Sequence, residues 1–240
     1  MDEGVEHFYL IDNGSTDNYE SIIKKYMNKI TLVKDSTRFV AVNHIGTQQI
    51  LENKYFLDKV KNESKWVFIC DIDEYLYNSR QLKILDYLNK VENIYEYIMI
   101  PYILFGSNLI NTPNDIPTSL IQCQNIKNIN ENLFKTILKT NVLLKIDCHN
   151  HLVKRNIRKI KLNYNDNLLL NHYQIISKSY YHNIRCVRGG GVHGPGEKYS
   201  INLYNTRNNK YSQDICEKLK DKKIFKINFK KYINNYKDLL

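Results

Sequence analysis

The chain has 240 residues, of which 42% are hydrophobic and 25% are charged. These proportions match those of an average soluble protein, so they exclude a disordered polymer and a membrane-embedded protein. The longest nearly apolar run, residues 97–105, is too short for the ~20 residues of a membrane-spanning helix, and we interpret it as a buried strand. Because domains of ~150 residues are typical, we expect one main domain with at most a small appendage.

Lysine and arginine outnumber aspartate and glutamate by 35 to 25, which gives a formal net charge of +10. This charge is compatible with nucleic acid, a phosphorylated ligand or a lipid surface, and it does not choose among them. The five cysteines are far apart and form no Cys-x-x-Cys pair, which disfavours a disulfide framework and a zinc site. No secretory signal is visible at the start, so we expect a cytoplasmic protein.

Strands and helices are predicted to alternate over the first 105 residues. Residues 5–12 and 30–33 have the composition of strands, with a helix between them that begins at Ser15 or Thr16. A second helix is expected at about 42–60. The alternation indicates an α/β protein with a mainly parallel sheet flanked by helices.

After residue 105 the pattern changes to short strands, loops and two further helices, typical of a mixed part of the fold. The expected strands are 119–126, 136–139 and 168–173, and the expected helices are about 177–187 and 213–220.

The segment 65–75 is rich in β-branched and aromatic residues and becomes acidic at Asp71, Asp73 and Glu74. If the strand continues through Ile72, Asp71 and Asp73 point to the same face, where their charges repel. Mg²⁺ or Mn²⁺ would relieve this repulsion, with water and phosphate oxygens as its other ligands. A helix cap near residue 79, or simply exposed loop acids, would produce the same pattern, and these alternatives stay open.

Asp12 also stands at the carboxyl end of an expected strand. Ligands of parallel sheets bind at the carboxyl ends of the strands. We therefore expect Asp12 and the Asp71/Asp73 pair to meet in one crevice.

Several segments together resemble nucleotide-sugar glycosyltransferases of the GT-A fold, in particular family 92 and the related family 2-like group. The first two are Asp-Asn-Gly-Ser-Thr-Asp at 12–17 and Phe-Ile-Cys-Asp-Ile-Asp-Glu-Tyr at 68–75. The downstream residues His172-Tyr173, Ser177, Tyr180-Tyr181, Arg185 and Arg188-Gly189 resemble the family's His-Tyr to Arg-Gly element in order and nearly in spacing. Shorter matches lie at 5–10, 105–107, 135–139 and 204–208.

The resemblance implies one GT-A-like domain over residues 1–220, with a nucleotide-sugar-binding half at 5–105 and an acceptor-binding half at 106–220. Residues 221–240 are left as a basic tail. The implied enzyme moves a sugar from a UDP-sugar to a hydroxyl of a glycan, glycoprotein or glycolipid. It uses Mn²⁺ or Mg²⁺ and inverts the anomeric centre, and no nucleic acid is expected as a partner.

Roles at the donor follow from the same resemblance. Asp12 would contact uracil or ribose, with Asp17 as a second candidate or a helix cap. Asp71 and Asp73 would hold the metal and the ribose-diphosphate. His172 would complete the metal shell, unless it is a core histidine.

Two arginines and a general base complete the expected site. Arg185 and Arg188 would neutralise the leaving diphosphate, unless they form a solvated basic face. Relatives tend to carry an acidic residue where this chain has Gln122, so the base is sought elsewhere. The catalytic candidates are Asp73, Glu74, Asp115 and His149. Of these, His149 matches a histidine that follows the 135–139 strand in relatives.

Alternatives to an active transferase stay open. The family normally has one further strand and helix before residue 5, so an inactive remnant is one reading, and a missing N-terminus could have held a membrane anchor. The tail at 218–237 interleaves lysines with Ile and Phe, which favours contact with an anionic membrane or packing on its own domain.

Two other classes of function are also considered. A nucleic-acid-binding protein would need clustered basic and aromatic residues, and a two-metal hydrolase would need more carboxylates.

Overall fold

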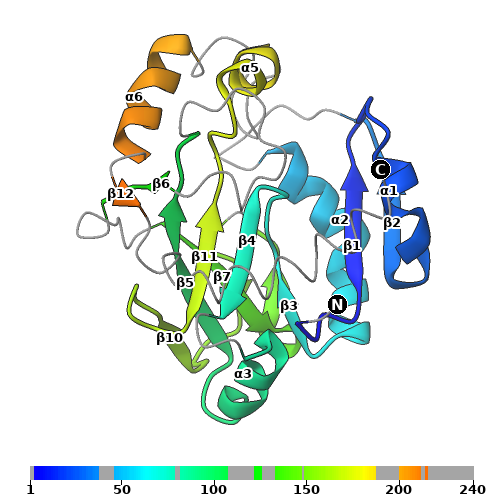
Figure 1. The fold of residues 1–240 in the computed structure, drawn as a ribbon. Coiled ribbons are helices and arrows are strands. Elements are labelled where there is room, and N and C mark those ends of the chain that lie inside the picture. The colour runs from blue at the N-terminus through cyan, green and yellow to red at the C-terminus, as the bar shows by residue number, and fades with distance from the viewer. Residues whose placement is uncertain are drawn as a thin grey trace. The chain divides into compact units, whose positions relative to one another are not determined.

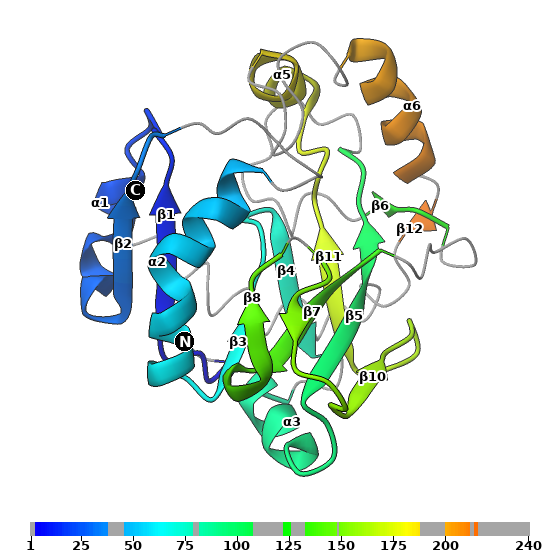
Figure 2. The same ribbon diagram turned by 180° about the vertical axis from the view of Figure 1, so that it is seen from behind.

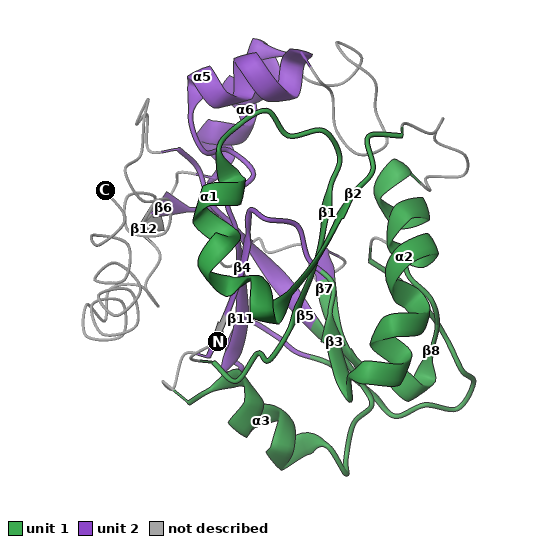
Figure 3. Ribbon diagram, turned by 90° about the vertical axis from the view of Figure 1, so that its right-hand side faces the viewer, with its two compact units in different colours: residues 1–69, 82–99, 135–161 green, residues 70–81, 100–134, 162–240 purple. Residues whose placement is uncertain are grey.

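A computed structural model describes residues 3–37, 46–78, 82–107, 122–125, 133–147, 149–187, 200–211 and 214–215. The chain forms two compact units, coloured separately in Figure 3. Unit 1 comprises Met1–Ile69, Leu82–Met99 and Lys135–Lys161; unit 2 comprises Cys70–Gln81, Ile100–Phe134 and Leu162–Leu240. The units interleave along the chain.

Unit 1 begins with a parallel pair of strands, β1 (Phe8–Asp12) and β2 (Ile30–Lys34), seen side by side in Figure 1. They are joined through the helix α1 (Tyr19–Ile23) and the 3-10 helix η1 (Lys24–Lys29). Both predicted strands and the helix between them are confirmed. The helix begins later than expected, with Asn18 as its N-cap. The carboxylate of Asp12 accepts the Ser15 backbone N–H, and this bond holds residues 12–15 in a turn before the helix.

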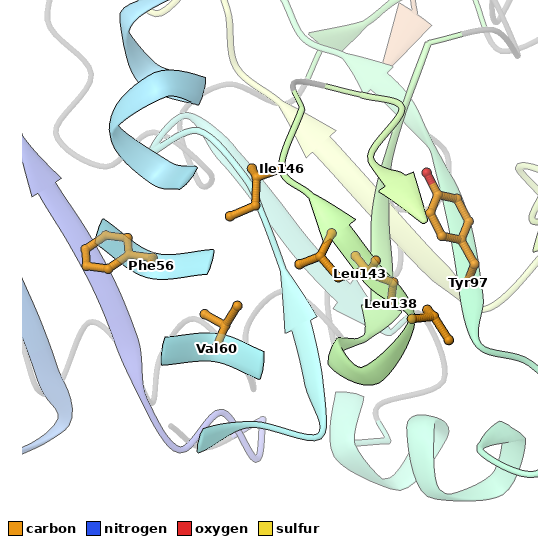
Figure 4. Packing of buried hydrophobic residues seen from close by; sticks show 7 residues of the cluster. Phe56, Val60, Tyr97, Leu138, Leu143 and Ile146 are labelled. Carbon is orange, nitrogen blue, oxygen red and sulfur yellow. The ribbon is translucent and has the colours of Figure 1, made fainter. Parts of the chain in front are cut away.

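The core of unit 1 forms around the helix α2 (Thr47–Glu63), which lies between β1 and the strand β8 (Leu143–Lys145) (Figure 2). Figure 4 shows Phe56 and Val60 of α2 together with the other labelled side chains of this cluster. The buried members are Phe56, Val60, Tyr97, Leu138, Val142, Leu143 and Ile146. Full burial of such side chains contributes about 1.5–3 kcal/mol each, so this cluster accounts for much of the stability of unit 1.

The remaining elements of unit 1 are short and pair in both directions. β3 (Trp66–Phe68) is antiparallel to β7 (Phe134–Lys139), β8 is antiparallel to β9 (Leu152–Val153), and β10 (Lys159–Lys161) is parallel to the first residues of β5 (Tyr97–Leu104). The helix α3 (Ile84–Val91) and the 3-10 helix η3 (Thr140–Val142) complete the unit.

Unit 2 is built on the later residues of β5, which pair in parallel with β11 (Leu168–His172). On its other side β11 is antiparallel to β4 (Glu74–Asn78). β6 (Gln122–Cys123) and β12 (Asp214–Ile215) form a further antiparallel pair. The helical elements are α5 (Lys178–Tyr180), the π-helix η4 (Tyr181–Cys186) and α6 (Ile201–Tyr211).

The α/β class is therefore confirmed, whereas the expectation of a mainly parallel sheet is wrong. The pairs β3–β7 and β4–β11 are antiparallel, and only long-range pairing, which hydrophobic periodicity does not report, decides strand direction. The strand at 97–105 is confirmed, and the helix at 177–187 is present but largely in π form. Of the helix expected at 213–220, Asp214–Ile215 is a strand, and the other residues lie outside the described ones.

Within the described ranges, no helix is both long and apolar enough to cross a membrane. The basic tail at 221–240 lies outside the residues that the structure describes.

Candidate active site

The acidic segment of unit 2 forms a closed turn directly before β4. The backbone N–H of Glu74 donates to the carbonyl oxygen of Asp71 at 3.1 Å, and the N–H of Asp71 donates to Oε2 of Glu74 at 2.9 Å. Ile72 stands at the tip of the turn and is 96% exposed, whereas Asp73 and Glu74 are buried. The strand does not continue through Ile72, so the expectation that extended backbone aligns Asp71 with Asp73 is wrong.

His172 lies between two carboxylates of this turn. It ends β11 directly opposite Glu74, and the N–H of Tyr173 donates to the carbonyl oxygen of Asp73 at 2.9 Å. Its Nε2 is 3.7 Å from Oδ2 of Asp73, and its Nδ1 is 3.9 Å from Oε1 of Glu74. The ring of Tyr102 packs against the imidazole with centroids 4.9 Å apart. The antiparallel β4–β11 pair thus brings together residues that are nearly 100 positions apart in sequence.

Arg185 reaches the same aspartate from the π-helix η4. Its Nη2 donates to Oδ2 of Asp73 at 3.0 Å. The side chain of Arg185 is 21% exposed and that of Asp73 only 7%, so the pair is largely withdrawn from water. π-Helical turns are rare and occur frequently at functional sites.

The helix that carries Arg185 is anchored at its start. Ser177 caps α5, with its Oγ accepting the N–H of Tyr180 at 3.1 Å. Tyr181 is buried with Ile175 and Tyr204, and the rings of Tyr181 and Tyr204 are 5.4 Å apart. These contacts fix the beginning of the helix, and with it the direction from which Arg185 approaches.

The charges around Asp73 favour its ionised form. Burial raises the pKa of Asp73, but the neighbouring His172 and the Arg185 guanidinium outweigh this effect and hold the pKa below the usual range for aspartate. Asp73 is therefore a charged carboxylate at neutral pH, in a place where an uncompensated charge would be costly.

Asp73 and His172 have an arrangement that fits two ligands of one divalent ion. Neighbouring ligands of an octahedral Mg²⁺ lie about 3 Å apart, and Oδ2 of Asp73 and Nε2 of His172 are 3.7 Å apart. Metal-bound histidines commonly donate their second ring N–H to a carboxylate, and Oε1 of Glu74 lies on that side at 3.9 Å from Nδ1, beyond hydrogen-bond distance. The described residues contain no group of three or more His, Cys, Asp and Glu side chains arranged for a metal, so an ion here would need substrate oxygens or water.

Asp12, expected at the nucleoside, lies in unit 1 and organises its own turn. Its Oδ1 accepts the Ser15 N–H at 2.7 Å, and its Oδ2 accepts the Tyr19 hydroxyl at 2.8 Å. The Ser15 N–H is the main cause that lowers the pKa of Asp12, while partial burial and the Asp12 carboxylate raise the pKa of Tyr19 to about 12. Asp17 is exposed nearby in sequence.

The other predicted residues are less informative. His149 is partly exposed in unit 1, and Asp115 and Arg188 lie outside the described residues. The sequence did not single out His151, which is buried; its Nδ1 accepts the N–H of Asp147 at 3.0 Å. Burial lowers the pKa of His151 to about 4, so it is neutral at physiological pH.

Two of the segments that resemble the glycosyltransferase motifs contact each other in unit 2. Ser107, from the segment 105–107, is bound by Tyr204 and Asn208, from the segment 204–208, in a fully buried cluster. No sequence pattern predicted this contact, because an asparagine gives no local sign that it is buried until its hydrogen-bond partner is known.

The model of glycosyltransferase family 92 matches residues 2–228. The chain belongs to glycosyltransferase family 92. No curated protein matches it.

Among solved structures, residues 1–349 of TarS from S. aureus are similar at 14% sequence identity and a TM-score of 0.39. The match covers 90% of this chain and 60% of the TarS chain, so this chain spans less than two thirds of that one.

Proposed function

We propose that this chain is a metal-dependent glycosyltransferase that moves a sugar from a UDP-sugar to an acceptor hydroxyl. The observation that carries the proposal is the buried, charged Asp73, whose Oδ2 lies near His172 and Arg185, two residues after the partly exposed Asp71. Membership of glycosyltransferase family 92 supports the class of reaction. A diphosphate is the ligand that such a set of carboxylates, imidazole and guanidinium suits, because a cation bridges the acidic groups to phosphate oxygens.

In this proposal Asp73 and His172 hold Mn²⁺ or Mg²⁺, and Asp71 binds the ion or the ribose of the donor. When bound, the ion would neutralise the charge that develops on the leaving nucleoside diphosphate. Glu74 keeps the His172 imidazole oriented, and Arg185 contacts the diphosphate. Asp12 and Asp17 contact the nucleoside; Asp12 would do so with lone pairs beyond those that Ser15 and Tyr19 occupy.

The acceptor would be a hydroxyl of a glycan, glycoprotein or glycolipid, attacked with inversion after a general base removes its proton. Glu74 is poorly suited to be this base, since its side chain is fully buried and its Oε2 accepts the Asp71 N–H. Asp115 and His149 are the candidates that remain.

The experiment that tests the proposal is calorimetric titration of the 240-residue chain with UDP, with and without Mn²⁺. We expect binding that requires Mn²⁺ and that weakens at least 100-fold in Asp73→Asn. Asp58→Asn removes an exposed carboxylate of α2 and serves as the matched control, with unchanged binding. Transfer from individual UDP-sugars, followed by mass spectrometry, then identifies the donor.

A wild-type chain that is folded by circular dichroism and binds no UDP with Mn²⁺ would overturn the proposal. The inactive remnant would then be the better reading. Binding that is equally strong without Mn²⁺ and in Asp73→Asn would place the donor site elsewhere.

A further inference from the structure

We propose that Arg185 occupies the metal-binding oxygen of Asp73 in the metal-free protein and moves to the donor diphosphate when the ion binds. This inference rests on the proposed function and deepens it, because it assigns one residue two successive partners. In this exchange, the metal ion replaces the Arg185 guanidinium at Oδ2 of Asp73.

The first observation is that the two contacts of Asp73 converge on a single oxygen. Oδ2 accepts the Nη2 donor of Arg185 at 3.0 Å and faces Nε2 of His172 at 3.7 Å. An ion held by Asp73 and His172 would lie about 2.1 Å from Oδ2. It would therefore come close to a guanidinium that is already in contact with that oxygen, and two cations at such a distance in a partly dry site repel strongly.

The second observation is that the Asp73 contact leaves Arg185 incompletely satisfied. A guanidinium carries five N–H donors. The Nε of Arg185 is buried, and no described residue accepts a hydrogen bond from it. The planar fork of arginine matches two phosphate oxygens at once, so a diphosphate would satisfy more of these donors than one carboxylate oxygen does.

The third observation is that the helix is anchored at its start, whereas Arg185 lies near its other end. The start of the helix is fixed by the Ser177 cap and by the burial of Tyr181. Arg185 lies near the other end, followed by Val187, which is 59% exposed. With 21% of its side chain open to solvent, Arg185 can exchange partners by rotation about its own side-chain bonds.

The exchange has a thermodynamic consequence. The ion must break the Arg185–Asp73 contact when it binds alone, whereas the donor diphosphate gives the released guanidinium a new partner. Metal and nucleotide should therefore strengthen each other's binding, and part of this coupling should pass through Arg185.

Direct binding measurements on the full chain test the exchange. Free Mn²⁺ is counted by electron paramagnetic resonance without nucleotide, for the wild type, Arg185→Gln and Arg158→Gln. Arg158 pairs with Glu96 in unit 1, so its variant removes the same charge without touching Asp73. We expect Arg185→Gln to bind Mn²⁺ roughly tenfold more tightly, because one charge-assisted hydrogen bond no longer has to be broken.

UDP binding at saturating Mn²⁺ is the second measurement. Arg185→Gln should bind UDP roughly tenfold more weakly than the wild type, and Arg158→Gln should bind it equally well. Opposite changes in the two affinities support the exchange, because a residue with a merely structural role would weaken both.

The possible failures are distinguishable. If the wild type binds UDP with Mn²⁺ but Arg185→Gln binds Mn²⁺ no more tightly, the exchange is overturned and the proposed function stands. If the folded wild type binds neither Mn²⁺ nor UDP, the proposed function fails and the exchange fails with it.

A measurement on the wild type covers the case in which Arg185→Gln does not fold. The Nε–H signal of Arg185, assigned by its loss in Arg185→Lys, is followed by NMR during titration with Mg²⁺ and then UDP. We expect it to shift at each step. A signal that Mg²⁺ leaves unmoved, while UDP binds afterwards, overturns the exchange.

Discussion

Asn208 of α6 binds Ser107 through two hydrogen bonds to a single oxygen: its Oδ1 accepts the backbone N–H at 2.8 Å and the hydroxyl Oγ at 2.9 Å. The hydroxyl of Tyr204 lies 2.8 Å from the same Oγ, and the N–H of Gly106 donates to the carbonyl oxygen of Tyr211 at 3.0 Å. This network holds the residues that follow β5 against α6. Because β5 pairs with β11 up to His172, it also supports the strand that carries the site.

Asn208→Ala should therefore destabilise the protein by about 2–3 kcal/mol, since it leaves the buried Ser107 N–H without its acceptor and removes one of two partners of the buried Ser107 hydroxyl. Urea denaturation measures the change. Tyr204→Phe should cost less, about 1 kcal/mol, because Ser107 keeps its bonds to Asn208. Thr206→Ala, at an exposed position of the same helix, should change stability by less than about 0.5 kcal/mol. An Asn208→Ala variant as stable as Thr206→Ala would contradict this account.

The buried His151 should make stability depend on pH. Its pKa is lowered to about 4 by burial, whereas in the unfolded chain it titrates near 6.5, so the unfolded state takes up the proton first as pH falls. Stability should be fully present above pH 6.5 and should decline between pH 6.5 and 4, by up to about 3 kcal/mol.

The check on His151 is urea denaturation across this pH range in the wild type and in His151→Asn. Asparagine can place an oxygen where Nδ1 accepts the Asp147 N–H, but it does not titrate. The slope of stability against pH should become smaller in the variant. An unchanged slope would show that other groups cause the decline.

Glu74→Gln separates a positioning role from a role as general base. If Glu74 orients His172, the variant should bind Mn²⁺ roughly tenfold more weakly, as is typical when a carboxylate behind a metal-binding histidine is lost. If Glu74 were the base, metal affinity would be unchanged and the rate of transfer would fall by about 10²–10⁴-fold. Mn²⁺ titration and single-turnover transfer distinguish the two outcomes.

Asp12 should contribute to the turn whether or not it also contacts the nucleoside. Asp12→Ala removes the acceptor of the Ser15 N–H and of the Tyr19 hydroxyl, and we expect a loss of about 1 kcal/mol in urea denaturation. Tyr19→Phe leaves the carboxylate in place, so UDP affinity should be retained in Tyr19→Phe. Weaker UDP binding in Asp12→Ala alone would support the nucleoside contact, and equal binding in both variants would confine Asp12 to the turn.

Much of unit 1 was predictable because its elements have strong local signals. β1, β2 and β5 are rich in aliphatic and aromatic residues, and α2 places most of its buried residues at helical spacing. α6 was not predicted, since its buried residues are only Tyr204 and Asn208, and the second is polar. β4 was also missed: it follows the acidic turn so closely that the preceding run looked like one strand.

By itself the sequence determined the apolar strands, the acidic segment at 71–74 and the order of motifs that places the chain in glycosyltransferase family 92, because these depend on residue type and short spacing. Only the tertiary structure decided that Asp73 faces His172 and Arg185, that Glu74 lies behind the imidazole, and that β4 runs antiparallel to β11. These contacts join residues about 100 positions apart, and such pairings follow from the packing of whole elements, which no local pattern of side chains encodes.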